Sequence, residues 1–96
     1  MKRQNAQPIS NILQRYLREE GLESPLNEYR LIHSWEAVLG QGIARYTGRM
    51  FIKNQTLHVH LTSPALRQDL QMARKNLIHR LNEAVGAQVI ADIVFY

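Results

Sequence analysis

RMFIKNQTLHVHLTSP, residues 49–64, has a period of two on both sides of Asn54-Gln55: Met50 and Ile52 alternate with Arg49, Phe51 and Lys53, and Leu57, Val59 and Leu61 alternate with Thr56, His58, His60 and Thr62. This alternation is typical of strands that bury one face. The two halves therefore predict a β-hairpin that begins after Gly48 and turns at Asn54-Gln55. Asn tolerates the left-handed conformation that a tight hairpin turn needs, although Gln is not the glycine usually found beside it.

The first predicted helix covers residues 8–20. Its apolar residues recur at positions i, i+3, i+4, i+7 and i+8, which places them on one side of a helix. Pro8 suits the first turn, where its missing N–H costs nothing, and Gly21 suits the left-handed residue that closes a helix. Residues 1–7 are expected to be a flexible N-terminus.

A second helix is predicted over residues 25–39. Ser24-Pro25 is a helix start signal, and Gly40 is a stop signal. Trp35 lies at the centre of the apolar side, so its large indole ring is expected in the core, where the ring N–H needs a partner. Residues 41–46 should add a short helical segment before the hairpin.

The third predicted helix is the longest element and follows the hairpin. It begins at Ser63-Pro64, runs without a break to Val85 and is closed by Gly86. The last residues, 89–96, are rich in β-branched and aromatic side chains and predict a final strand. The apolar stripe of the long helix is expected to consist of Leu66, Leu70, Ala73, Leu77, Leu81 and Ala84.

The predicted order of elements is helix-helix-strand-strand-helix-strand. This order indicates an α+β two-layer fold, with a three-stranded sheet packed on one face by the long third helix. A chain of 96 residues without repeats or long linkers is expected to fold residues 8–96 as a single domain.

Composition excludes several classes of function. The chain has no cysteine, so disulfides and thiolate metal sites are excluded, and no apolar signal or membrane segment follows its start. No nucleophile elbow, phosphate-binding loop or dinucleotide-binding glycine pattern is present. We therefore expect a cytoplasmic protein that is not an enzyme, needs no cofactor and has no membrane partner.

Positive charge is concentrated in the middle of the chain. Residues 1–40 carry five basic and five acidic side chains, whereas residues 41–80 carry seven basic side chains and only Asp69, a local net charge of +6. Such a field attracts partners that bear phosphates or carboxylates. The alternative is a solvated basic surface that only aids solubility.

Six basic side chains of the hairpin and long helix are the main binding candidates, because neutralised phosphates release their counterions. If five of them contacted DNA, log K would fall against log[salt] with a slope of roughly −4 to −5. Alternatively, some of them pair with the carboxylates of Asp69, Glu83 or Glu36. The candidates are Arg45, Arg49, Lys53, Arg67, Arg74 and Lys75.

Phe51, His58 and His60 form a second candidate group, since they can share the open face of the hairpin and stack on unpaired bases. The favoured interpretation for Phe51 is nevertheless the core, with the long helix covering this face. The spacing of His58 and His60 also suits a metal, but no third ligand is close in sequence, so no metal site is predicted.

Four segments, at residues 35–44, 57–63, 77–82 and 93–95, resemble the bacterial family called domain of unknown function 721, which includes the DciA replicative-helicase operators. The resemblance extends over nearly the whole chain. It implies a KH-like domain that binds nucleic acid and engages the replicative helicase at its loading onto DNA. The GxxG loop with which KH domains usually grip a nucleic-acid backbone is missing from this sequence.

These observations predict a non-catalytic nucleic-acid-binding accessory module, with DNA favoured over RNA and the replicative helicase as a candidate partner. The alternative is a protein-interaction adaptor that docks through its first helix or through an exposed sheet edge, without contact to nucleic acid. Monomer and homodimer both remain open.

Overall fold

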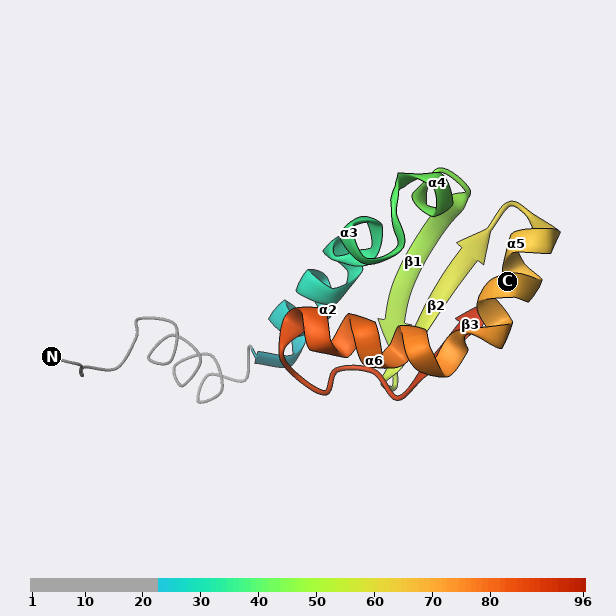
Figure 1. Ribbon diagram of the computed structural model, residues 1–96. Helices are drawn as coiled ribbons and strands as arrows, with labels where there is room; N and C mark the ends of the chain where they lie inside the picture. The colour runs from blue at the N-terminus through green and yellow to red at the C-terminus, as the bar shows by residue number, and fades with distance from the viewer. Residues whose placement is uncertain (1–22) are drawn as a thin grey trace, which may run out of the picture.

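The computed structural model describes residues 23–96 (Figure 1). The predicted N-terminal segment 1–7 and the predicted helix 8–20 lie outside the described residues. Within residues 23–96 the fold is α+β, as predicted, and contains a three-stranded sheet.

The sheet has the order β1-β2-β3 and is mixed. β1 and β2 pair antiparallel through the predicted hairpin, and β2 and β3 pair parallel. Asn54 and Gln55 have φ of 53° and 61°, which confirms the turn and identifies it as the two-residue type whose central residues both have positive φ. The strands are β1 (Thr47–Lys53), β2 (Thr56–Leu61) and β3 (Asp92–Phe95).

The helices differ from the sequence prediction in where they break. The predicted helix 25–39 is two helices separated at Ser34, whose hydroxyl donates to the Leu31 carbonyl at 2.7 Å. Residues 41–46 contain the predicted short helix. The elements before the sheet are α2 (Glu23–His33), α3 (Trp35–Leu39) and α4 (Gln41–Ala44).

The predicted long helix is likewise two helices, α5 (Pro64–Met72) and α6 (Arg74–Val85), which meet at Ala73. Ala73 has φ −98° and ψ 12°, outside the helical region, and its N–H donates to the Leu70 carbonyl. The bend lets α5 contact β2 and β3 while α6 contacts α2, α3 and β3. It also changes the buried stripe, because Ala73 and Ala84 are exposed and Val85 is buried instead.

Both predicted caps around these helices are confirmed. The Ser63 hydroxyl accepts from the Leu66 N–H at 3.3 Å, and Pro64 occupies the first turn. Gly86 closes α6 in the left-handed conformation, with φ 80° and ψ 23°. These local signals therefore fixed the ends of the predicted helix correctly, although its middle was predicted wrongly.

β3 is shorter than the predicted strand 89–96, because Asn82 of α6 binds the preceding segment. Its Oδ1 accepts from the N–H groups of Val89 at 2.9 Å and Ile90 at 3.0 Å, and its Nδ2 donates to the Ile90 carbonyl at 2.9 Å. The Asn82 side chain is buried. Residues 89 and 90 are thus held by a helix side chain, whereas the N–H of the next residue, Ala91, donates to the Gln55 carbonyl at 2.7 Å.

The core lies between the helices and one face of the sheet (Figure 1). Trp35 is 2% exposed, as predicted, and its indole N–H donates to Thr47 Oγ1 at 3.0 Å. Leu57, Val59 and Leu61 of β2 are buried beneath the helices.

Within residues 23–96 there is no helix with the length and apolar character needed to cross a bilayer.

Candidate nucleic-acid interface

The second face of the sheet is not covered by helices of the described region. Residues directly opposite each other in a ladder point to the same side, so the register assigns each side chain to a face. We call the uncovered side the open face. It carries Arg49, Phe51 and Lys53 of β1, Thr56, His58 and His60 of β2, and Asp92 and Val94 of β3 together with the following Tyr96.

A stacked pair of rings lies on the open face. The Phe51 and His58 rings are parallel to within 5°, with centroids 4.6 Å apart, and the Arg49 guanidinium lies 5.0 Å from the Phe51 ring centroid. The favoured prediction that Phe51 is core is therefore wrong. The ring is half-buried, but its neighbours are His58 and Arg49, and it lies outside the core cluster.

A second aromatic contact lies two residues further along β2. The His60 and Tyr96 rings have centroids 5.3 Å apart and are tilted by 55°. Gly48 makes room for His60, because a Cβ at Gly48 would lie 2.7 Å from His60 Nδ1. Tyr96 was not among the sequence candidates, although alternation with Phe95 could have placed it on this face.

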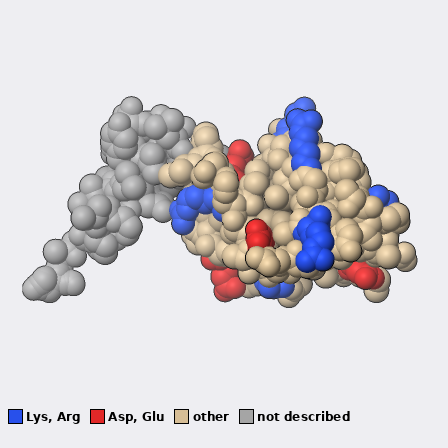
Figure 2. Space-filling model, turned by 90° about the horizontal axis from the view of Figure 1, so that it is seen from above, with Lys and Arg blue, Asp and Glu red and all other residues tan. Residues whose placement is uncertain are grey.

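The six basic candidates are not brought together. Arg49 and Lys53 are exposed on the open face, and Arg45 is exposed at the end of α4. Lys75 lies apart from them at the start of α6 in the helical layer. Figure 2 shows Lys and Arg in separate groups on the face drawn there, with Asp and Glu between them.

Two of the six cations already have partners within the fold. Arg74 Nε lies 3.6 Å from Asp92 Oδ1, and the two side chains are partly exposed. Arg67 donates from its terminal nitrogen to the Leu61 carbonyl at 3.5 Å, while its buried Nε finds no hydrogen-bond partner within residues 23–96. The partner of Arg74 is Asp92, and among residues 23–96 none of the carboxylates named in the sequence prediction pairs with these two cations.

His58 and His60 do share one face of β2, as their spacing predicts. In the part of the chain that the structure describes, no three His, Asp or Glu side chains converge on a point where a metal ion would fit. His58 faces Phe51 and His60 faces Tyr96. The chemistry that this face offers is thus flat ring stacking beside two cations.

The comparisons with known proteins agree with the likeness to DciA proteins seen in the sequence. The model of the family described as "Dna[CI] antecedent, DciA" matches residues 8–95. A UPF0232 protein of Corynebacterium glutamicum (strain R) is 23% identical over 88 residues, which are 92% of this chain and 49% of that protein. The chain thus spans about half the length of this curated relative. Since the family model covers nearly all of the sequence, the chain belongs to the DciA family.

Proposed function

We propose that this chain is a non-catalytic accessory module of DNA replication that binds single-stranded DNA on the open face of its sheet and assists the replicative helicase at DNA. The observation that carries the proposal is the stack of Arg49, Phe51 and His58. It is a flat, partly exposed ring pair beside a cation, on a sheet face that no described helix covers.

Stacking favours unpaired bases as the ligand. Every base has a π face, and stacking on an aromatic side chain contributes about 1–3 kcal/mol per base. A duplex hides those faces inside its own stack, so it would meet only the cations of the surface. The pair Phe51–His58 and the pair His60–Tyr96 occur two residues apart along β2, roughly 7 Å, and offer two separate places for bases.

The positive charge near the open face also favours single-stranded DNA, although it provides only a few phosphate contacts. Arg49 and Lys53 lie on the open face, and Arg45 precedes β1. Two or three phosphate contacts to a single strand give a slope of log K against log[salt] of roughly −1.5 to −2. This is much shallower than the slope of roughly −4 to −5 expected if five of the six basic candidates contacted DNA.

The helicase role rests on family membership. We extend the proposal to a KH-like fold, supported by the mixed three-stranded sheet with helices on one side. Because the GxxG loop is missing, the proposed DNA contact is the sheet face and not a helix–loop grip. The proposed unit is the single domain 8–96.

A titration of the full chain with labelled DNA tests the proposal. Fluorescence anisotropy would compare a 20-nucleotide single strand, its duplex and the matching RNA strand at several salt concentrations. We expect the single strand to bind more tightly than the duplex, with the shallow slope given above. Tighter binding to the duplex, with a slope of log K against log[salt] near −4 to −5, would instead show that most of the six basic candidates contact DNA.

The alternative of a protein adaptor has its own signature. Absence of DNA binding at low salt would contradict the proposal. If the replicative helicase of the same organism were still retained on the immobilised chain at high salt, the adaptor interpretation would replace it. A chain that binds single-stranded DNA and also retains the helicase would support the full proposal.

A further inference from the structure

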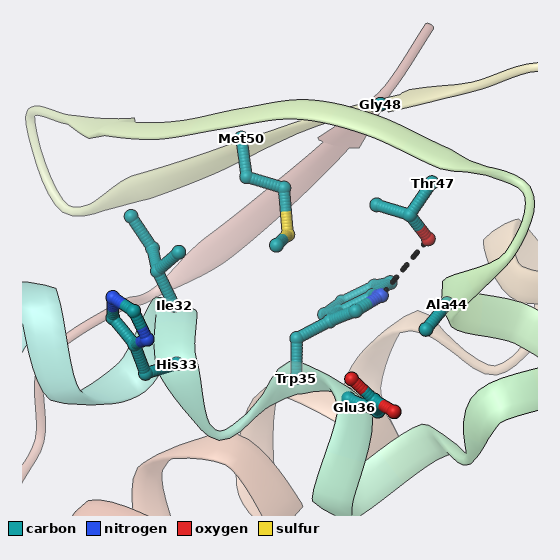
Figure 3. A pocket seen from close by; sticks show the side chains of 8 residues that line it. All are labelled: Ile32, His33, Trp35, Glu36, Ala44, Thr47, Gly48 and Met50. Carbon is teal, nitrogen blue, oxygen red and sulfur yellow. Dashed lines mark hydrogen bonds between the residues drawn. The ribbon is translucent and has the colours of Figure 1, made fainter.

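A groove with an apolar floor lies between β1 and the helices α2, α3 and α4, away from the open face. It has a volume of about 270 Å³. Figure 3 shows Met50 extending from β1 towards Trp35, with Ile32 beside it, so that these three side chains form the apolar part. Glu36, His33 and Thr47 contribute polar groups to the lining.

The strand beside this groove is the edge of the sheet. β1 pairs only with β2, and within residues 23–96 no strand lies beyond it. Such an edge presents backbone N–H and C=O groups that an extended peptide can pair with. The ladder with β2 is irregular between Thr47 and Met50 and regular from Met50 to Lys53, which leaves a short straight segment for pairing.

The alternation of β1 determines what an added strand would contact. A residue directly opposite Met50 would point to the same side as Met50, and therefore into the groove. Its two neighbours would point to the opposite side, next to Arg49 and Phe51, and the residue three positions away would point to that side next to Lys53. Both of these basic side chains are exposed.

We propose that β1 and this groove bind an extended segment of a partner protein, which adds to the sheet as a strand. One bulky aliphatic side chain of the segment occupies the groove, and acidic side chains at the alternate positions lie beside Arg49 and Lys53. Charge complementarity selects this partner, since the edge strand is basic on its open side, while Glu36 disfavours an acidic residue within the groove.

The size of the groove favours a side chain over a small-molecule ligand. Sites for cofactors and drug-sized molecules usually measure about 300–1,000 Å³. At about 270 Å³ with an open mouth, this groove suits one side chain whose backbone is held by the strand. Main-chain pairing then supplies affinity, and the groove supplies selectivity.

The site has a consequence for DNA binding that rests on the proposed function. Arg49 would contact an acidic side chain of the bound segment and also takes part in the open-face stack. A bound segment would therefore lower the affinity for single-stranded DNA without blocking the rings. The groove itself contains no residue of the open-face stack, so the two activities can be separated by substitution.

An eight-residue synthetic peptide that alternates Glu and Leu is a suitable probe, titrated into the isotope-labelled full chain by NMR. We expect shifts at the amides of residues 49–53 and at the Trp35 indole N–H. Ala44→Leu fills the groove from α4 and should raise the Kd about tenfold or more. Ala84→Leu, on the exposed side of α6, is the matched control and should change the Kd less than about twofold.

Two altered peptides test the mode of binding. Proline in place of a peptide residue whose backbone N–H would bond to β1 should abolish binding, because proline lacks that donor. Replacement of Glu by Lys should weaken binding at least about tenfold. No binding of the parent peptide at millimolar concentration, or equal binding by the proline peptide, would overturn the proposal.

Sedimentation and DNA titration complete the test. A concentration-dependent dimer of the free chain that Ala44→Leu abolishes would assign the edge to a second copy and overturn the proposal of a partner segment. Ala44→Leu should leave the affinity for single-stranded DNA unchanged. A chain that fails to bind DNA but binds the peptide would contradict the proposed function and support this groove, so the two failures are distinguishable.

Discussion

The imidazole of His58 lies parallel to the phenyl ring of Phe51, with centroids 4.6 Å apart and planes 5° apart. The two residues are direct partners in the β1–β2 ladder, so the register of the hairpin itself brings the rings together. Arg49 lies over the Phe51 ring on the same face. Because the ladder register holds the rings in place, fewer side chains have to be ordered when a base binds, which lowers the entropic cost of binding.

Phe51→Ala removes the centre of this stack. We expect the Kd for a single-stranded oligonucleotide to rise about ten- to a hundredfold, because one base loses its stacking partner. Val94→Ala, on the same face but aliphatic, should raise it less than about threefold. Urea unfolding of both variants separates loss of binding from loss of stability. Equal effects of the two substitutions on the Kd would contradict stacking on Phe51.

Arg49→Gln and Arg74→Gln compare a cation that lies over the Phe51 ring with one that is paired to a carboxylate. Arg49 lies on the open face, whereas Arg74 lies beside Asp92. Loss of one phosphate contact should make the slope of log K against log[salt] shallower by about 0.7 for Arg49→Gln. Arg74→Gln should leave the slope unchanged. If both variants shift it equally, the basic candidates act as one field and not through the open face.

The parts of the fold that depend on local chemistry could be read from the sequence. The hairpin turn, the Ser63 cap and the Gly86 stop each need a particular residue at a particular place. The break between α5 and α6 at Ala73 could not be predicted from the sequence, because Ala is a strong helix former and no Gly or Pro lies there. The packing of α5 on the sheet and of α6 on α2 and α3 accompanies that break.

The side of the sheet on which Phe51 lies could have been predicted from the sequence. A two-residue turn at Asn54-Gln55 pairs Lys53 with Thr56, and counting outward pairs Phe51 with His58. Since Leu57 and Val59 of β2 are apolar, the polar His58 and its partner must face away from the core. The separation of the six basic candidates could not have been predicted from the sequence, because it depends on where the helices lie relative to the sheet.

Asn82→Ala tests the clamp that orders the segment before β3. The substitution leaves the N–H groups of Val89 and Ile90 and the Ile90 carbonyl without their partners. We expect the free energy of unfolding to fall by about 2–4 kcal/mol, since buried polar groups without partners are costly. Asn76→Ala, exposed in the same helix, should change it by less than about 0.5 kcal/mol. A loss below about 1 kcal/mol for Asn82→Ala would show that water replaces the clamp.

Gln55→Gly should stabilise the domain, because Gln55 holds a φ of 61°, a left-handed conformation that is strained for Gln. Glycine adopts this conformation without strain but is more flexible when unfolded, so the net gain should be about 0.5–1 kcal/mol. The bond from the Ala91 N–H to the residue 55 carbonyl involves backbone only and survives the change. Gln71→Gly, at an exposed position of α5, should instead cost about 0.5–1 kcal/mol. Thermal and urea unfolding measure both effects, and destabilisation by Gln55→Gly would contradict a positive-φ turn in solution. Since the turn fixes the register, an unchanged turn must also leave the stack of Phe51 on His58, and hence the affinity for single-stranded DNA, as it was.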